Sequence, residues 1–160
     1  MDKITDTHVY FWGDKTLSNW GPAEFEYRGK HFYNSEQAFM WEKAILFDDQ
    51  EIAEKILEND NPSTVKALGR KVKNFDLPSW SEKSYQVMVD VCYAKFDQNP
   101  KLKETLFSTG DKTIVEASPM DRILGVGLHW ENDEILDELN WNGMNLLGKA
   151  LMEVRENLWP

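Results

Sequence analysis

The stretch NSEQAFMWEKA, from Asn34 to Ala44, constrains the fold more than any other part of the sequence. Asn34 or Ser35 is suited to cap a helix, because a short polar side chain can accept hydrogen bonds from the free backbone N–H groups of the first turn. The apolar residues that follow, at positions 38, 39, 41, 44, 45 and 47, cover much more than one narrow stripe of that helix. A helix that is apolar on several sides packs against several neighbours, so we expect it at the centre of its fold.

The flanking segments predict a mixed fold in which helices dominate. Aromatic and β-branched residues favour strands at Thr7–Trp12 and Lys112–Ala117, and Phe25–Phe32 is typical of a β-hairpin with a glycine in its turn. Glu134–Leu139 fits one or two helical turns. Helical spacing predicts further helices that open at Asp48-Asp49, Pro62, Ser81, Asn99-Pro100 and after Gly143. We therefore expect an α+β, mostly helical chain: a single compact domain over residues 1–160, with a small N-terminal hairpin and a central helix that lines a pocket.

Charge and cysteine content narrow the function classes. Acidic residues outnumber basic ones by 28 to 18, which gives a formal net charge of -10 and disfavours a broad groove for nucleic acid, although a local basic site for one small phosphate ligand stays open. Cys92 is the only cysteine, and its helical context predicts a core thiol. The three histidines share no ligand spacing, so we expect no metal site. No apolar run reaches the length of a membrane span and the start lacks a secretory signal, which predicts a cytoplasmic protein.

Two opposite charges, Glu36 and Lys43, lie inside the apolar helical pattern. A surface ion pair on a helix prefers a spacing of three or four residues, whereas these two residues are seven apart. A seven-residue step returns to within about 20° of its start, so both side chains face the same way, about 10 Å apart along the axis. That separation could accommodate a sugar ring. Spacing alone still favours a simpler interpretation, a first-turn glutamate stabilised by the helix dipole and an independent surface lysine.

Other polar residues stand where packing does not require them. Ser18 and Asn19 lie in an aromatic loop before Trp20, and Arg70 follows Leu68-Gly69 on a predicted helix. Asp121 opens a loop that contains Gly125 and Gly127, and Asn145 stands at the start of the last helix. Turn formation, a helix-end charge or a cap explains each of them equally well. For Asn145 a helix cap is the favoured interpretation, and for Asp121 a turn and a functional role are equally supported.

The ordered set of motifs resembles the NADAR family, named for NAD and ADP-ribose, whose members are N-glycosidases. The resemblance spans nearly the whole chain, and the order of the pieces makes it specific. It is carried by LSNW at Leu17–Trp20, the aromatics and glycine of Phe25–Phe32, NSEQAFMWEKA, ALGRKVK at Ala67–Lys73, the run from Trp80 to Leu102, LFSTGDKTIVEASPMDRILGVGL and WNGMNLLGKALMEVR.

The resemblance implies roles for the polar residues. It implies that Glu36 is the catalytic acid or base, that Lys43 is a catalytic lysine on the same helix, and that Asp121 belongs to the catalytic group. It also implies that no cofactor or metal is needed. The implied substrate-binding residues are Ser18, Asn19, Trp20, Arg70, Trp80, Gly125, Gly127 and Asn145.

The resemblance leaves the substrate open. It implies a small ribosyl metabolite such as an intermediate of riboflavin biosynthesis, with two alternatives: removal of ADP-ribose from guanine, or a module that binds ADP-ribose or NAD without cleaving it. The chain departs from the family pattern at Leu124, where the family often has a tryptophan before the first glycine of the loop. If that tryptophan stacks on a base or ribose, this chain lacks the platform. The number of subunits is not readable from the sequence.

Overall fold

The computed structural model describes residues 3–13 and 16–160. The described elements are mostly helices with two small sheets, so the predicted α+β, mostly helical class is confirmed. The chain forms two compact units, Met1–Ser18 with Pro100–Pro160, and Asn19–Asn99. We call them the sheet unit and the helical unit. A single domain over residues 1–160 stays a prediction.

The sheet unit is built on three strands, β1 (Lys3–Ile4), β2 (His8–Phe11) and β5 (Thr113–Glu116). β2 lies between the other two, antiparallel to β1 and parallel to β5. The predicted strands at Thr7–Trp12 and Lys112–Ala117 are confirmed, and β1 is an addition that the sequence did not predict. One side of the sheet contributes Tyr10, Val115 and Ala117 to a buried cluster with Val126, Leu128 and Ile135.

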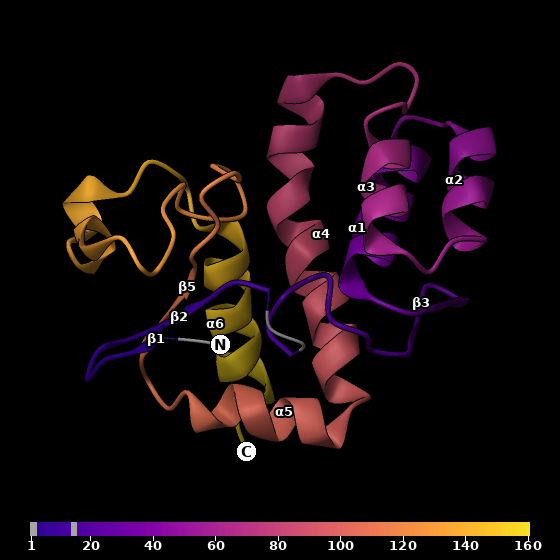
Figure 1. Cartoon of the computed structure of the whole chain (residues 1–160). Helices are drawn as coiled ribbons and strands as arrows, with labels where there is room; N and C mark the ends of the chain where they lie inside the picture. The colour runs from indigo at the N-terminus through magenta and orange to yellow at the C-terminus, as the bar shows by residue number, and fades with distance from the viewer. Residues whose placement is uncertain (1–2, 14–15) are drawn as a thin grey trace. The chain divides into compact units, whose positions relative to one another are not determined.

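Two α-helices and two short 3₁₀ turns complete the sheet unit. They are α5 (Pro100–Ser108), η1 (Asp133–Leu136), η2 (Glu138–Asn140) and α6 (Leu146–Leu158). Helix α6 packs along β5, as Figure 1 shows. Gly148 permits this close approach, because a Cβ atom on it would lie only 2.2 Å from the Ile114 carbonyl oxygen. The helices predicted to open at Asn99-Pro100 and after Gly143 are both confirmed.

The helical unit is organised around α1 (Ser35–Leu46). α1 packs against α2 (Gln50–Leu57), α3 (Pro62–Gly69) and α4 (Leu77–Asp97), and Figure 1 shows α1, α2 and α3 side by side. Ala38 and Ala44 on α1 are fully buried. The central position that the sequence predicted for this helix is therefore confirmed within its unit.

The predicted hairpin is present in the helical unit. β3 (Phe25–Tyr27) pairs with β4 (Lys30–Phe32) through a two-residue turn, Arg28-Gly29. Both turn residues have positive φ, 51° and 78°, as the twist of a tight hairpin requires. Arg28 also donates a 2.7 Å hydrogen bond to the buried Glu42 carboxylate, which ties the turn to α1.

The predicted start of the long helix at Ser81 is wrong. Helix α4 begins at Leu77, with Asp76 as its N-cap, and the Asp76 carboxylate accepts a hydrogen bond from the Ser79 backbone N–H. Pro78 stands in the first turn, where a proline fits because its missing N–H is not needed. The segment NFDLP therefore contains both the cap and the first residues of α4. None of the described helices has both the length and the apolar character of a membrane span.

Candidate active site

The start of α1 places Glu36 in the first helical turn. Of the two predicted candidates, Asn34 and Ser35, Asn34 is the cap, because its side-chain oxygen accepts a 2.8 Å hydrogen bond from the Gln37 backbone N–H. Glu36 is 5% exposed, and its backbone N–H donates to the Asn19 carbonyl oxygen at 3.0 Å. Two residues that the sequence analysis singled out separately, Glu36 and Asn19, are therefore neighbours in the helical unit.

Lys43 is fixed two turns further along α1. Its Nζ donates a 2.8 Å hydrogen bond to the Gly69 carbonyl oxygen and lies 4.6 Å from the centre of the Phe75 ring. Burial lowers the pKa of Lys43, the Glu36 carboxylate opposes that shift, and the Arg70 guanidinium adds to it. A lowered pKa increases the share of neutral amine, which is the form that can act as a nucleophile.

The same electrostatic effects place Glu36, Lys43 and Arg70 in one neighbourhood. Arg70 is the exposed C-cap residue of α3, next to the glycine whose carbonyl oxygen holds Lys43. Its guanidinium is therefore free to meet solvent while its charge acts on the lysine. A partly buried amine whose pKa responds to both a carboxylate and a guanidinium is suited to acid–base or nucleophilic work on an anionic molecule.

Phe75 belongs to this neighbourhood, and the sequence analysis missed it. It lies between α3 and α4, and its ring packs against Phe47 at 5.3 Å while 43% of the residue stays exposed. A phenylalanine shortly after the basic stretch Arg70–Lys73 was the available signal. Its contact with Lys43 spans 32 positions of sequence, which local patterns do not reveal.

Buried polar atoms lie close to Glu36. Asn19 is 3% exposed and its amide nitrogen contacts the Met88 sulfur at 3.4 Å. Within the part of the chain that the structure describes, the Asn19 side-chain oxygen and the Ser35 hydroxyl have no hydrogen-bond partner. Because a buried polar atom without a partner is costly, these two atoms are candidates to bind a ligand or water.

The tryptophans of the helical unit differ in how much of their ring surface is exposed. Trp20 is 45% exposed, and Trp80 packs its ring against Phe39 at 5.1 Å while remaining partly exposed. Trp41 is buried, and its ring lies 5.5 Å from that of Phe32. Trp20 and Trp80 therefore keep surface that a base could contact, whereas Trp41 is part of the core.

The remaining predicted residues lie in the sheet unit, where the structure gives several of them local bonds. Ser18, at the end of its first segment, is buried. Asp121 accepts hydrogen bonds from the backbone N–H groups of Ile123 at 2.9 Å and Leu124 at 2.8 Å, both through Oδ1. This bonding fits the turn interpretation of Asp121 and leaves Oδ2 for other partners.

Gly125 and Gly127 allow the backbone of the loop that begins at Asp121 to follow its path. A Cβ atom on Gly125 would lie 2.9 Å from the carbonyl oxygens of Asp121 and Glu116, and Gly127 has a φ of 73°. The loop is also paired with the segment before α6, since the Asn145 backbone N–H donates to the Gly125 carbonyl oxygen. Both glycines are thus required by the loop geometry alone.

The predicted cap role of Asn145 is wrong. Asn145 occupies the N-cap position of α6 in the left-handed region, with a φ of 53°, but its side chain makes no capping bond. Its amide accepts from the Glu116 N–H at 3.0 Å and donates to the Ile114 carbonyl oxygen at 2.9 Å. Because its side chain forms hydrogen bonds with backbone groups of β5, Asn145 connects the start of α6 to the sheet.

The structure therefore divides the predicted site residues between the two units. The helical unit brings together Glu36, Lys43, Asn19 and Arg70, with Phe75 as an added member. The sheet unit holds Asp121, Gly125 and Asn145 in a bonded loop of its own. Assignment of any of these residues to the chemistry stays a prediction.

Comparison with known proteins identifies the family. The model of the NADAR domain matches residues 10–159. The chain belongs to the NADAR family. The NADAR match covers both units, from β2 to the residue after α6.

Individual NADAR relatives match over most of the chain. Protein irg-1 of Caenorhabditis elegans is 47% identical over 80% of the chain, and the chain spans 61% of the length of that relative. N-glycosidase R617 of Acanthamoeba polyphaga mimivirus is 40% identical over 95% of the chain and 96% of its own length. The NMR structure of the Escherichia coli protein YbiA matches 98% of the chain and 87% of its own with a TM-score of 0.78, at 28% identity.

Proposed function

We propose that the chain is an N-glycosidase that hydrolyses the bond between ribose C1′ and a nitrogen of its substrate. The observation that carries the proposal is the pairing of a buried carboxylate, Glu36, with a lysine of lowered pKa, Lys43, on one helix of a chain whose relatives include a named N-glycosidase. The substrate class that we favour is a small phosphoribosyl metabolite, such as an intermediate of riboflavin biosynthesis.

The charge of the chain supports a small substrate. A net charge of -10 repels long phosphate backbones, whereas one exposed guanidinium at Arg70 can bind two oxygens of a single phosphate. The side-chain oxygens of Asn19 and Ser35 can bind sugar hydroxyl groups, and Trp20 or Trp80 can stack on the base. These partners fit a phosphate, a pentose and a ring.

Two routes to bond cleavage use the same two residues. In the first route, Glu36 takes a proton from a water molecule that adds to C1′, the C1′–N bond breaks, and the departing nitrogen receives a proton. The carboxylate also stabilises the positive charge that develops on the sugar. No group other than water is consumed.

In the second route, the neutral amine of Lys43 attacks C1′ of the opened sugar. The C1′–N bond to the base breaks as a Schiff base forms, and the base nitrogen leaves with a proton moved by Glu36. Water then adds to C1′ and releases the free amine of Lys43. This route requires the lysine to be partly unprotonated, which its lowered pKa favours.

The decisive experiment is a parallel incubation of the chain with ribosylamino-pyrimidine phosphates, ADP-ribosylated guanosine, NAD and ADP-ribose, followed by mass spectrometry of the released base. We expect release from the first substrate class. Release only from ADP-ribosylated guanosine would replace the substrate and keep the chemistry. Binding without release from any of them would contradict the enzyme proposal and identify a binding module.

Glu36→Gln tests the residue assignment. The amide has the same shape and cannot take a proton, so we expect a folded protein, verified by its circular dichroism, with hydrolysis reduced by at least about 10²-fold. Unchanged turnover would remove Glu36 from the chemistry.

Borohydride reduction during turnover separates the two routes. A covalent adduct that is lost in Lys43→Ala supports the Schiff base, and the absence of any adduct supports direct attack by water.

A further inference from the structure

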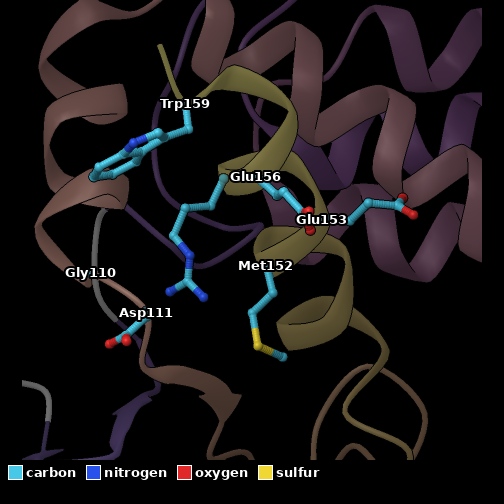
Figure 2. Close-up of a pocket in the computed structure, with 7 residues that line it drawn as sticks. Gly110, Asp111, Met152, Glu153, Glu156 and Trp159 are labelled. Carbon is cyan, nitrogen blue, oxygen red and sulfur yellow. The ribbon is translucent and has the colours of Figure 1, made fainter.

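A cavity of about 900 Å³ lies in the sheet unit, and none of the residues proposed for hydrolysis lines it. Gly110 and Asp111 border it between α5 and β5, and the other lining residues come from the end of α6 and the residue that follows it. Figure 2 shows Trp159 on one side of this space and Asp111 and Met152 on the other. A volume of this size is in the range of pockets that bind small molecules.

Trp159 offers a flat surface in this cavity. It is 55% exposed, and its ring meets the Phe107 ring nearly edge to face at 5.0 Å. The contact with Phe107 holds the indole in place, so its free surface is presented in a defined orientation. Indole rings in such positions stack on planar heteroaromatic rings, and the Met152 thioether provides a further soft apolar contact.

Arg155 supplies fixed hydrogen-bond donors. Its Nη1 donates to the Thr109 hydroxyl at 2.9 Å and to the Lys112 carbonyl oxygen at 2.8 Å, which anchors the guanidinium at the wall of the cavity. Within the described residues, Nε and Nη2 make no hydrogen bond. Arg155 is partly buried, which lowers the pKa of its guanidinium, and an acceptor from a ligand would restore what solvent no longer provides.

Asp111 supplies the matching acceptor. Its charge acts on Arg155, but the two side chains do not approach within the 4.0 Å of an ion pair, and Asp111 is exposed. A guanidinium and a carboxylate that stand near each other without pairing can bind a ligand edge that has a C=O next to an N–H. Glu153 and Glu156 make the lining net negative, which disfavours a phosphate group.

We propose that this cavity is a binding site for an unphosphorylated nucleobase or nucleoside with a lactam edge. The ring stacks on Trp159, its carbonyl oxygen accepts from Arg155, and its N–H donates to Asp111. This inference does not depend on the proposed hydrolysis, because it names a second site with residues of its own.

The test is a titration of the full ¹⁵N-labelled chain followed through the tryptophan indole N–H signals, with the Trp159 signal assigned by its loss in Trp159→Leu. The probes are inosine, which has a lactam edge, 1-methylinosine, in which a methyl group replaces the N–H, inosine 5′-phosphate, and spermidine. We expect saturable movement of the Trp159 signal with inosine. Binding should weaken about tenfold or more with 1-methylinosine, and it should also be weaker with the phosphate ester.

Variants repeat the test from the protein side. Asp111→Ala, in an exposed loop, should weaken inosine binding about tenfold, whereas Glu104→Ala, an exposed carboxylate of α5 that does not line the cavity, should leave it unchanged. Three results would overturn the proposal: equal affinity for inosine and 1-methylinosine, movement of other indole signals while that of Trp159 stays in place, or the absence of saturation. Tighter binding of spermidine at Trp159 would also overturn it, since it would mean that the carboxylates select a cation. If Trp159→Leu does not fold, the methylated probe and Asp111→Ala still decide the question.

Discussion

At the scale of single residues, Lys43 is subject to opposing effects. Burial favours its neutral amine, Glu36 favours the charged form, and Arg70 again favours the neutral amine. The net result is a lowered pKa. Two substitutions on opposite sides of this balance should therefore move the pKa of Lys43 in opposite directions.

We predict that Arg70→Ala raises the pKa of Lys43 and that Glu36→Gln lowers it. The first removes a positive charge that opposes protonation, and the second removes a negative charge that favours it. NMR of ¹³Cε-labelled lysine, with the Lys43 signal assigned by Lys43→Ala, measures both pKa values. Lys71→Ala, which removes a neighbouring exposed cation, is the control and should have the smaller effect.

The sign of the effect on activity follows if the neutral amine is the nucleophile. Activity then rises with pH as Lys43 loses its proton, so a higher pKa in Arg70→Ala moves the acid limb of the pH–rate profile to higher pH. An acid limb that does not move while the NMR pKa does would show that the amine is not the group that limits the rate.

A second prediction concerns Gly69, at the end of α3. A Cβ atom there would lie 2.2 Å from the sulfur of Met40 on α1, so Gly69→Ala must displace either Met40 or the helix end that holds Lys43. We expect a loss of about 1–3 kcal/mol in the free energy of unfolding and a shift of the Lys43 NMR signal. Urea unfolding of Gly69→Ala in a Met40→Ala background provides the check. The loss should be much smaller there, and an equal loss would show that Met40 is not the obstacle.

At the scale of elements, the start of α4 provides a direct comparison between sequence and structure. Asp76→Ala removes the observed cap and should lower the free energy of unfolding by about 1 kcal/mol. Ser81→Ala removes the cap that the sequence predicted, but Ser81 is an exposed residue inside the helix, so the free energy of unfolding should stay within about 0.5 kcal/mol of that of the unsubstituted chain. Urea midpoints of the two variants distinguish these outcomes, and a larger loss for Ser81→Ala would place the helix start where the sequence suggested.

Elements with local signals were predictable from the sequence. The cap at Asn34, the turn at Gly29 and the first-turn Pro62 act within a few residues, and each predicted its element correctly. The start of α4 was missed because Asp76 and Ser81 are both good caps, and only the packing of the helix decides between them. Asn145 was misassigned because its partners, Ile114 and Glu116, lie 31 and 29 positions away.

At the scale of the whole molecule, formal charge makes a prediction that does not depend on any one residue. With a net charge of -10, we expect no complex with a short DNA duplex in a mobility-shift assay at low salt, the condition that most favours binding to phosphate backbones. A complex that appears at low salt and disappears as salt is added would reveal a basic surface that the average charge conceals.

The candidate site was predictable in part at this scale. Helical geometry alone put Glu36 and Lys43 on the same face, and the Glu36 carboxylate counters the lowering of the Lys43 pKa by burial. What spacing could not supply was the burial of each group, the carbonyl oxygen that accepts from Lys43, and Phe75. Those depend on α3 and on the segment before α4 folding back onto α1, and such contacts are set by packing between distant segments.

The acceptor that fixes Lys43 belongs to the main chain at Gly69. Every amino acid carries that oxygen, so no replacement of one residue by another can delete it. As related sequences diverge, the position of the Lys43 amine can therefore change only indirectly, through a change in how the end of α3 packs on α1. Variation at Met40, which lies between Glu36 and Lys43 on α1 and packs against Gly69, would then be a means by which related chains adjust the reactivity of the amine.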